Sequence, residues 1–246
     1  MFRYQILIEY EGTNFRGWQI QKKGKTIQGL IQENISKILS QKIILFGSGR
    51  TDTGVHALEQ SAHFDSEKKI INCKKFVNSM NHFLNKENVT IIKVKKRNNN
   101  FHARFSAKMR IYKYVIINRL STPVLEKNRV WHIKKKLDLN TMKRGAKKLV
   151  GTKNFSTFRA SSCRAKSPVK FMKSVKIKCV KNKIEIEFRS PSFLQKQVRS
   201  MVGCLKYIGE KKWSISKFEM IFESKDRTLC APPAPALGLY LKKIIY

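Results

Sequence analysis

Segments with the two-residue alternation of β-strands and segments with the three- and four-residue spacing of helices are intermixed along this chain of 246 residues. In residues 26–41 apolar side chains recur at helical spacing, directly after residues 1–10, which read as a strand. The regular strand–helix succession of a doubly wound parallel sheet is absent. The pattern therefore predicts an α+β fold of two α/β halves, each with a largely antiparallel sheet flanked by helices.

The first half is expected to be an N-terminal α+β domain of residues 1–105. Its remaining elements are two strands on either side of a glycine-rich loop, then a helix and a strand: 43–46, 60–65, 76–84 and 89–94. A basic, asparagine-rich connector at residues 95–100 follows.

The second half is expected to be a C-terminal α+β domain of residues 106–246. It contains an alternating strand at 110–117, a helix at 139–150, strands at 169–180 and 183–189, a basic helix at 194–208, a helix at 215–222 and a closing strand at 239–245. Lys181-Asn182 is expected to be a hairpin tip, and Ser214 is expected to cap the helix that follows it. No clear sequence repeat proves that the halves arose by duplication.

The charge balance narrows the class of partner. Fifty-two Lys and Arg residues against sixteen Asp and Glu residues give a formal net charge of +36, which favours a polyanionic partner. Nucleic acid is the first candidate, although a genome rich in A and T also raises the lysine content. An anionic membrane is disfavoured, since no apolar run approaches the roughly 20 residues that span a bilayer and no signal peptide opens the chain. A cytoplasmic protein is expected.

Cysteine and histidine spacing argues against disulfide and metal chemistry. The five cysteines form an odd set without a close pair, as expected for reduced thiols in a cytosol. Neither Cys-x-x-Cys nor His-Glu-x-x-His occurs, and the five histidines are scattered. No metal site is therefore expected.

The segment Gly47-Ser48-Gly49-Arg50-Thr51-Asp52-Thr53-Gly54 places three glycines around one arginine and one aspartate, between two predicted strands. Glycine permits positive φ and a close approach, so such a loop can press its backbone against a substrate. The spacings of the common phosphate-binding and dinucleotide-binding loops are absent. From the residues alone, a catalytic Asp52 and an Asp52 that only caps a turn both remain open.

Continued by Val55-His56-Ala57, this loop closely resembles the catalytic signature of the TruA family of tRNA pseudouridine synthases. Further segments resemble the family in the same order along essentially the whole chain: Tyr10-Glu11-Gly12-Thr13, Gly17-Trp18-Gln19, Thr26-Ile27-Gln28-Gly29, Phe101-His102-Ala103-Arg104-Phe105-Ser106-Ala107, Phe155-Ser156-Thr157-Phe158-Arg159-Ala160, Ser167-Pro168-Val169, Val198-Arg199, Asp226-Arg227-Thr228 and Gly238-Leu239-Tyr240-Leu241. Each piece alone is weak, and their common order carries the resemblance.

The resemblance implies the pseudouridine synthase fold and a homodimer that acts on tRNA without a cofactor. The implied substrate positions are uridines 38, 39 and 40 of the anticodon stem-loop. The reaction breaks the bond from C1′ to N1, turns the uracil and rejoins it through C5, with no redox change. Asp52 matches the family's nucleophile, and its carboxylate can attack either C1′ or C6. The sequence leaves that choice open.

Three more residues match the family's active site. Arg199 matches a partner arginine that keeps the carboxylate ionised, although a phosphate contact on a basic helix is the alternative. Tyr112 matches a tyrosine that stacks on the uracil, but Tyr112 and Tyr114 should share one strand face, so one of them is open to a core role. Arg50 matches an arginine that assists flipping of the target base, against a turn-stabilising role. Which lysines contact RNA remains open.

Two departures and two rival functions complete the expectations. Leu194-Gln195-Lys196-Gln197 stands where the family often has His-Met, and Lys170 stands where arginine is common. Neither change touches the proposed nucleophile. The rivals are a basic RNA-binding protein that kept the fold without the activity, and a pseudouridine synthase that acts on another RNA or tRNA position.

Overall fold

The computed structural model describes all 246 residues, and they form two compact units. Unit 1 consists of Met1–Lys108 and Tyr240–Tyr246, and unit 2 consists of Met109–Leu239. Each unit combines helices with a mostly antiparallel sheet, which confirms the predicted fold class. The expected boundaries, 1–105 and 106–246, differ from this division chiefly at the C-terminal strand, which belongs to unit 1.

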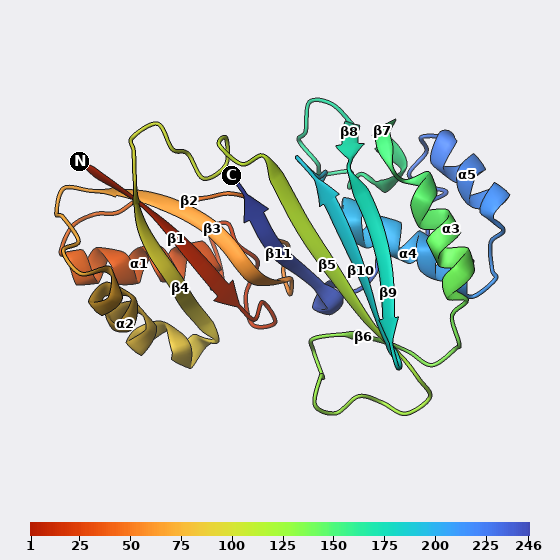
Figure 1. Ribbon diagram of the computed structural model, residues 1–246, viewed down its shortest axis with the longest axis horizontal. Coiled ribbons are helices and arrows are strands. Elements are labelled where there is room, and N and C mark those ends of the chain that lie inside the picture. Colours follow the sequence, from red (N-terminus) through yellow and green to blue (C-terminus); the bar gives the residue numbers. More distant parts are fainter. The chain divides into compact units, whose positions relative to one another are not determined.

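The sheet of unit 1 has the strand order β4–β1–β3–β11, and a short β2 also pairs with β3 (Figure 1). Its strands are β1 (Phe2–Tyr10), β2 (Phe46–Gly47), β3 (His56–Ser66), β4 (Val89–Arg97) and β11 (Leu239–Ile245). β1 lies antiparallel to β3 and β4, whereas β11 runs parallel to β3, with Tyr240 opposite His56. The final strand is thus placed by pairing with residues far away in the sequence.

Two helices, α1 (Ile27–Leu39) and α2 (Cys73–Leu84), pack against each other in unit 1, and a 3₁₀ turn, η1 (Asn85–Glu87), follows α2. Thr26 caps α1 by accepting the backbone N–H of Gly29, and Asn72 caps α2. Their buried side chains recur at helical spacing: Ile27, Ile31, Ile35, Phe76, Met80 and Leu84. Both helices confirm the sequence prediction.

The strand predicted at 43–46 is wrong except at its end, because β2 begins only at Phe46. The backbone N–H of Ile43 donates to Ser36 Oγ at 3.2 Å, and that of Leu45 donates to Gln32 Oε1 at 3.0 Å. Side chains of α1 therefore satisfy backbone groups that a neighbouring strand would otherwise bind. Ile43 and Leu45 are still buried, so the apolar pattern predicted their burial correctly but wrongly predicted that they pair with a strand.

The predicted connector at 95–100 is partly wrong as well. β4 continues to Arg97, which pairs with Arg3 of β1, so the strand extends three residues beyond its predicted end at Val94. The basic composition marks an exposed strand end here rather than a linker.

The main sheet of unit 2 has the order β5–β10–β9, from β5 (Met109–Asn118), β9 (Ser174–Val180) and β10 (Lys183–Ser190). β9 and β10 are antiparallel, with Lys181 at positive φ in the connection, as expected for a hairpin tip. A short strand, β6 (Trp131–Ile133), lies parallel to β5.

The strand predicted at 169–180 is two strands. β8 (Val169–Met172) pairs with β7 (Gly151–Asn154) in a separate two-stranded sheet, while β9 pairs with β10. The chain changes partners at Lys173, whose backbone N–H donates to the carbonyl of Arg189 at 2.8 Å. A single alternating pattern therefore spans two different sheets.

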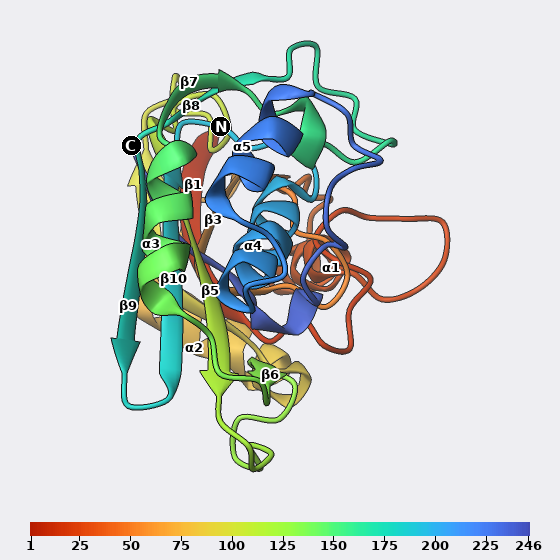
Figure 2. The ribbon, with the colours of Figure 1, turned by 90° about the vertical axis from the view of Figure 1, so that its right-hand side faces the viewer.

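Three helices, α3 (Leu139–Lys148), α4 (Gln197–Gly209) and α5 (Ile215–Glu223), pack on one another beside the sheet of unit 2 (Figure 2). Ser214 caps α5, as predicted. Two 3₁₀ turns, η2 (Ser156–Phe158) and η3 (Ala236–Gly238), complete the unit. None of the helices has both the length and the apolar composition needed to cross a membrane.

Candidate active site

Asp52 lies half-buried in the loop between β2 and β3, where the backbone on both of its sides is hydrogen-bonded. The backbone N–H of Trp18 donates to the Thr51 carbonyl, and that of Val55 donates to the Asp52 carbonyl, each at 3.1 Å. The Tyr10 hydroxyl and Thr51 Oγ1 lie 2.8 Å apart in a buried hydrogen bond. The loop is thus fixed at the residues that flank the carboxylate.

Glycines from the opening segment allow this loop to lie against its support. Gly17 has φ +81°, and a Cβ built on it would lie 2.5 Å from the Thr51 carbonyl oxygen. A Cβ on Gly12 would overlap the Val55 carbonyl even more severely. Only glycine gives both the positive φ and the close backbone contact at position 17.

The other flank of the loop is bound to β3. Gln60 is fully buried, and its Nε2 donates to the Gly49 carbonyl at 2.8 Å. The backbone N–H of Ser48 donates to the carbonyl of Ser61 at 2.8 Å. The loop is therefore held at its entry, at Thr51 and at Val55, and Asp52 projects from a fixed backbone.

Arg50 belongs to the same loop but has a different environment. Its side chain is exposed, and its Nε donates to Gln19 Oε1 at 3.1 Å. Gln19 directly follows Trp18, which binds the loop backbone. The guanidinium is thus held loosely at the surface of the Asp52 loop.

In unit 2, β5 carries two tyrosines with distinct environments. Tyr114 is fully buried, its hydroxyl donates to the Pro235 carbonyl at 2.8 Å, and burial raises its pKa well above the usual range. Tyr112 is 9% exposed, and its ring meets that of Phe193 edge to face at a centroid distance of 5.0 Å. The core role left open for one of these residues therefore falls to Tyr114.

Arg199 lies half-buried on α4 and makes two hydrogen bonds to one residue. Its Nε donates to the Ala234 carbonyl at 2.7 Å, and the backbone N–H of Ala234 donates to the Arg199 carbonyl at 2.9 Å. Gly203, one turn farther along, leaves no room for a Cβ beside the Pro232 carbonyl. The contact between α4 and residues 231–235 therefore fixes the position of the Arg199 Nε atom.

The start of α4 corrects one expectation. The helix begins at Gln197, so Leu194 precedes it, and the turn between them has Lys196 at φ +61°. Gln197 Oε1 accepts the backbone N–H of Leu194 at 2.7 Å. Of the segment that departs from the expected His-Met pattern, Leu194, Gln195 and Lys196 thus precede the helix, and only Gln197 belongs to it.

Comparison with known proteins settles the family. The family model described as tRNA pseudouridine synthase matches residues 6–106 and 146–246. The chain belongs to the tRNA pseudouridine synthase family.

Curated members of this family match over the full length of the chain. A protein named tRNA pseudouridine synthase A from Pelagibacter ubique (strain HTCC1062) is 65% identical over 246 residues, covering 100% of both chains. Proteins of the same name from Parvibaculum lavamentivorans and Paramagnetospirillum magneticum are each 41% identical and cover 100% of this chain, and the chain covers 100% and 96% of them, respectively. The chain is therefore an isomerase that acts on uridine in tRNA.

The four site residues expected from the family resemblance fall into two sets. Asp52 and Arg50 share one loop of unit 1, whereas Tyr112 and Arg199 lie on β5 and α4 of unit 2. Several glycine and aromatic positions that resemble the family, such as Gly12, Gly17 and Trp18, are the residues that support the Asp52 loop.

Three supporting residues were not singled out from the sequence: Gln60, Phe193 and Ala234. Gln60 is a polar residue at a buried strand position, a combination that signals a structural hydrogen bond once the burial pattern is known. Phe193 and Ala234 act through a ring contact and a backbone carbonyl, for which the sequence gives no local signal.

Proposed function

We propose that this chain converts uridine to pseudouridine at positions 38, 39 and 40 of the tRNA anticodon stem-loop, with Asp52 as the nucleophile. The observation that carries the proposal is the half-buried carboxylate on a loop whose backbone is bound on both flanks, in a chain of this family. Resemblance to the TruA family supplies the substrate positions, a homodimer and a reaction without a cofactor, and the odd, unpaired set of cysteines supports a cytoplasmic location.

The reaction is an isomerisation, so every atom of the uridine is retained or exchanged with water. The bond from C1′ to N1 breaks, a bond from C1′ to C5 forms, C5 loses a proton and N1 gains one. Covalent attack by Asp52 at C1′ or at C6 divides this change into easier steps. The fixed loop lowers the entropic cost of aligning the carboxylate with its target atom.

A carboxylate nucleophile must remain ionised when the substrate excludes water from it. We assign this electrostatic support to Arg199. Its side chain is half-buried, and its Nε is held by a hydrogen bond to the Ala234 carbonyl. The Tyr112 ring is proposed to stack on the uracil, and its contact with Phe193 limits the positions it can adopt.

A base in the stem must leave its stack before the carboxylate reaches it, which costs a few kcal/mol. Arg50 is exposed on the same loop as Asp52 and is proposed to occupy the vacated space or to bind the adjacent phosphate. The net charge of +36 supplies the long-range attraction for the tRNA backbone.

The test maps pseudouridine in an unmodified tRNA transcript that carries uridines 38, 39 and 40, without any added cofactor. Native protein is compared with Asp52→Asn, which removes the carboxylate charge at nearly constant volume. The matched control is Asp138→Asn, because Asp138 caps α3 and asparagine caps helices equally well.

Product at the three positions from native protein and Asp138→Asn, with a loss of at least about 10³-fold for Asp52→Asn, is the expected result. Binding of tRNA should survive in all three proteins, because phosphate contacts dominate affinity. Turnover by Asp52→Asn would overturn the nucleophile, and product confined to other positions would overturn the substrate assignment. A folded native protein that binds tRNA without turnover would favour a binding protein.

A further inference from the structure

Four aromatic rings of unit 1 form a surface group that the proposed chemistry does not use. The rings of Phe105 and His102 lie 4.4 Å apart, those of His102 and His63 lie 4.6 Å apart, and those of His63 and Phe46 stack at 5.1 Å. We call these four residues the ring cluster. Its inner member His63 is 1% exposed, whereas Phe105 is 75% and Phe46 is 43% exposed.

The exposed end of the ring cluster is held in place by the turn around it. His102 Nδ1 accepts the backbone N–H groups of Arg104 and Phe105 at 3.1 and 3.4 Å. The backbone N–H of His102 donates to Ser106 Oγ at 2.9 Å, and that of Ser106 donates to the His102 carbonyl at 2.9 Å. Phe105 thus stands on a closed turn rather than on a free loop.

An ion pair fixes the start of this turn to the sheet. Arg3 binds Asp65 through two hydrogen bonds of 2.7 Å and also donates to the carbonyls of Asn99 and Phe101. The Arg3 guanidinium lowers the pKa of Asp65, so the pair stays charged at neutral pH. Burial of two phenylalanine rings would stabilise the fold more than their exposure, so this ordered exposure needs another explanation.

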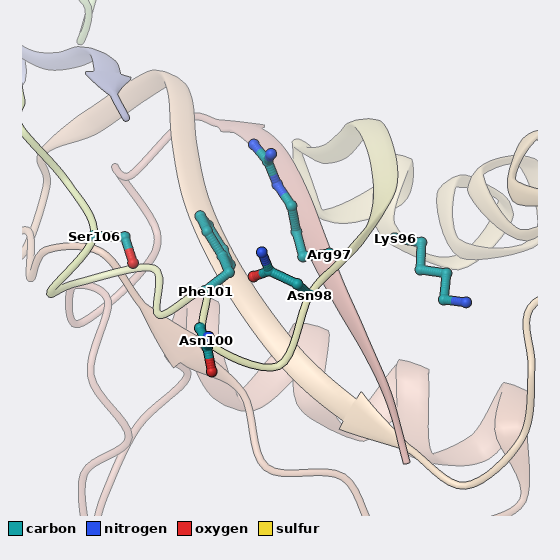
Figure 3. Close-up of a pocket in the computed structure, with 6 residues that line it drawn as sticks. All are labelled: Lys96, Arg97, Asn98, Asn100, Phe101 and Ser106. Atoms are coloured by element: carbon teal, nitrogen blue, oxygen red, sulfur yellow. The ribbon is translucent and has the colours of Figure 1, made fainter.

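A cation lies over one ring of the cluster, and a pocket on the same segment is lined by cationic and amide side chains (Figure 3). The Arg104 guanidinium lies over the Phe105 ring at 5.5 Å, and the Arg97 guanidinium lies over the Phe101 ring at 4.8 Å. The pocket, of about 420 Å³, has no acidic residue in its lining, which consists of Lys96, Arg97, Asn98, Asn100, Phe101 and Ser106. The lining of this pocket therefore carries positive charge and no negative charge.

The ring cluster is continuous along the chain with the Asp52 loop. Phe46 is the first residue of β2, and Gly47 opens the loop that carries Asp52, all within unit 1. Phe46 pairs with His63 on β3, and the loop that carries Asp52 returns to the same strand at His56, so one strand joins the two sites.

We propose that the ring cluster is a stacking site for an unpaired base of a tRNA loop, other than the base that is isomerised. Exposed rings with adjacent arginines are the surface that single-stranded nucleic acid uses, because every base has a face that stacks. Phe105 and Phe46 supply the stacking faces, and Arg104 binds the adjoining phosphate. The inference rests on the proposed function for its partner, tRNA.

The test compares Phe105→Leu, which keeps an apolar side chain but removes the ring, with Phe105→Tyr, which keeps the ring. The matched control is Phe83→Leu, because Phe83 is 52% exposed on α2 and also meets a histidine ring, that of His82, at 5.1 Å. Dissociation constants are measured by fluorescence anisotropy with a fluorescein-labelled, unmodified tRNA transcript. Thermal unfolding of each variant shows that it is folded.

Phe105→Leu is expected to weaken tRNA binding at least about fivefold, the lower end for loss of one stacked base. Phe105→Tyr and Phe83→Leu should bind within about twofold of native protein, and Phe46→Leu should weaken binding as Phe105→Leu does. Native affinity in both leucine variants would overturn the inference. A change of oligomeric state in Phe105→Leu by sedimentation, with tRNA affinity unchanged, would assign the rings to a protein contact instead.

Failure of this inference and failure of the proposed function are separable, since the binding measurement does not depend on turnover. Product at other uridines with ring-dependent binding would refute the substrate positions and retain the stacking site. Product at positions 38, 39 and 40, with tRNA affinity unchanged when the Phe105 ring is removed, would support the substrate positions and refute the stacking site.

Discussion

Gly17→Ala tests whether the close support behind Thr51 and Asp52 sets the rate of isomerisation. The φ of +81° costs an alanine roughly 1–2 kcal/mol. The new Cβ would also lie 2.5 Å from the Thr51 carbonyl oxygen, which is backbone and cannot rotate away as a side chain can. The φ strain acts on residue 17 itself, whereas the overlap acts on Thr51, the residue that precedes the nucleophile.

The size of the effect follows from the distance that must be recovered. Ordinary contact begins at 3.4 Å, so the loop has to shift by about 0.9 Å, and a displacement near 1 Å from reactive geometry costs on the order of a hundredfold in rate. The strain in φ alone lowers the melting temperature by roughly 2–8 °C in a chain of this size.

Gly151→Ala separates these two effects. Gly151 has φ +105°, but a Cβ there would meet only the far end of Lys153, at 3.9 Å. Single-turnover pseudouridine formation and thermal unfolding are measured for both variants. We expect a similar loss of melting temperature from the φ strain, with the hundredfold loss of rate confined to Gly17→Ala. Equal rates in the two variants would refute the role of the support.

Two further results follow from the titratable groups. Burial, with the positive charges of His102 and Arg3, lowers the pKa of His63 to about 4, so the folded chain binds this proton more weakly than the unfolded chain. The contribution of His63 to the free energy of unfolding is therefore present above about pH 6.5 and is lost as the pH falls towards 4. An NMR titration of the His63 ring protons with a midpoint near pH 6.5 would contradict this expectation. The sulfurs of Cys204 and Cys230 lie 3.6 Å apart, and the hydrogen bond from Cys204 lowers the pKa of Cys230. Diamide, which accepts the two electrons and two protons, should join them in a disulfide seen by mass spectrometry, whereas recovery of both residues as alkylated thiols would contradict the expectation.

Local signals in the sequence predicted much of the fold. The Ser214 cap and the hairpin tip at Lys181 act within a few residues of the elements they bound, and the structure has them where the sequence predicts them. The prediction was wrong where backbone partners are distant. Side chains of α1 replace a strand partner at Ile43 and Leu45, and one alternating segment divides between two sheets at Lys173.

The candidate site shows the same division between local and distant information. The glycine-rich loop can be found from the sequence, but the roles of Asp52 and Arg50 within it came from its resemblance to the TruA family. The contacts of Tyr112 with Phe193 and of Arg199 with Ala234 join residues 81 and 35 positions apart, and no periodic pattern encodes such pairs. The sequence did not predict that Cys204 and Cys230 lie close together, because they are 26 residues apart and no short motif joins them.

The most direct test of the central claim follows the C5 proton, which pseudouridine formation must release. Unmodified tRNA transcript is prepared with tritium at C5 of its uridines, and release to water is measured in single turnover for native protein and for Asp52→Asn. The account predicts release by native protein and none above background by Asp52→Asn, although both bind the tRNA. Release by Asp52→Asn at the native rate would contradict the claim that Asp52 is the nucleophile.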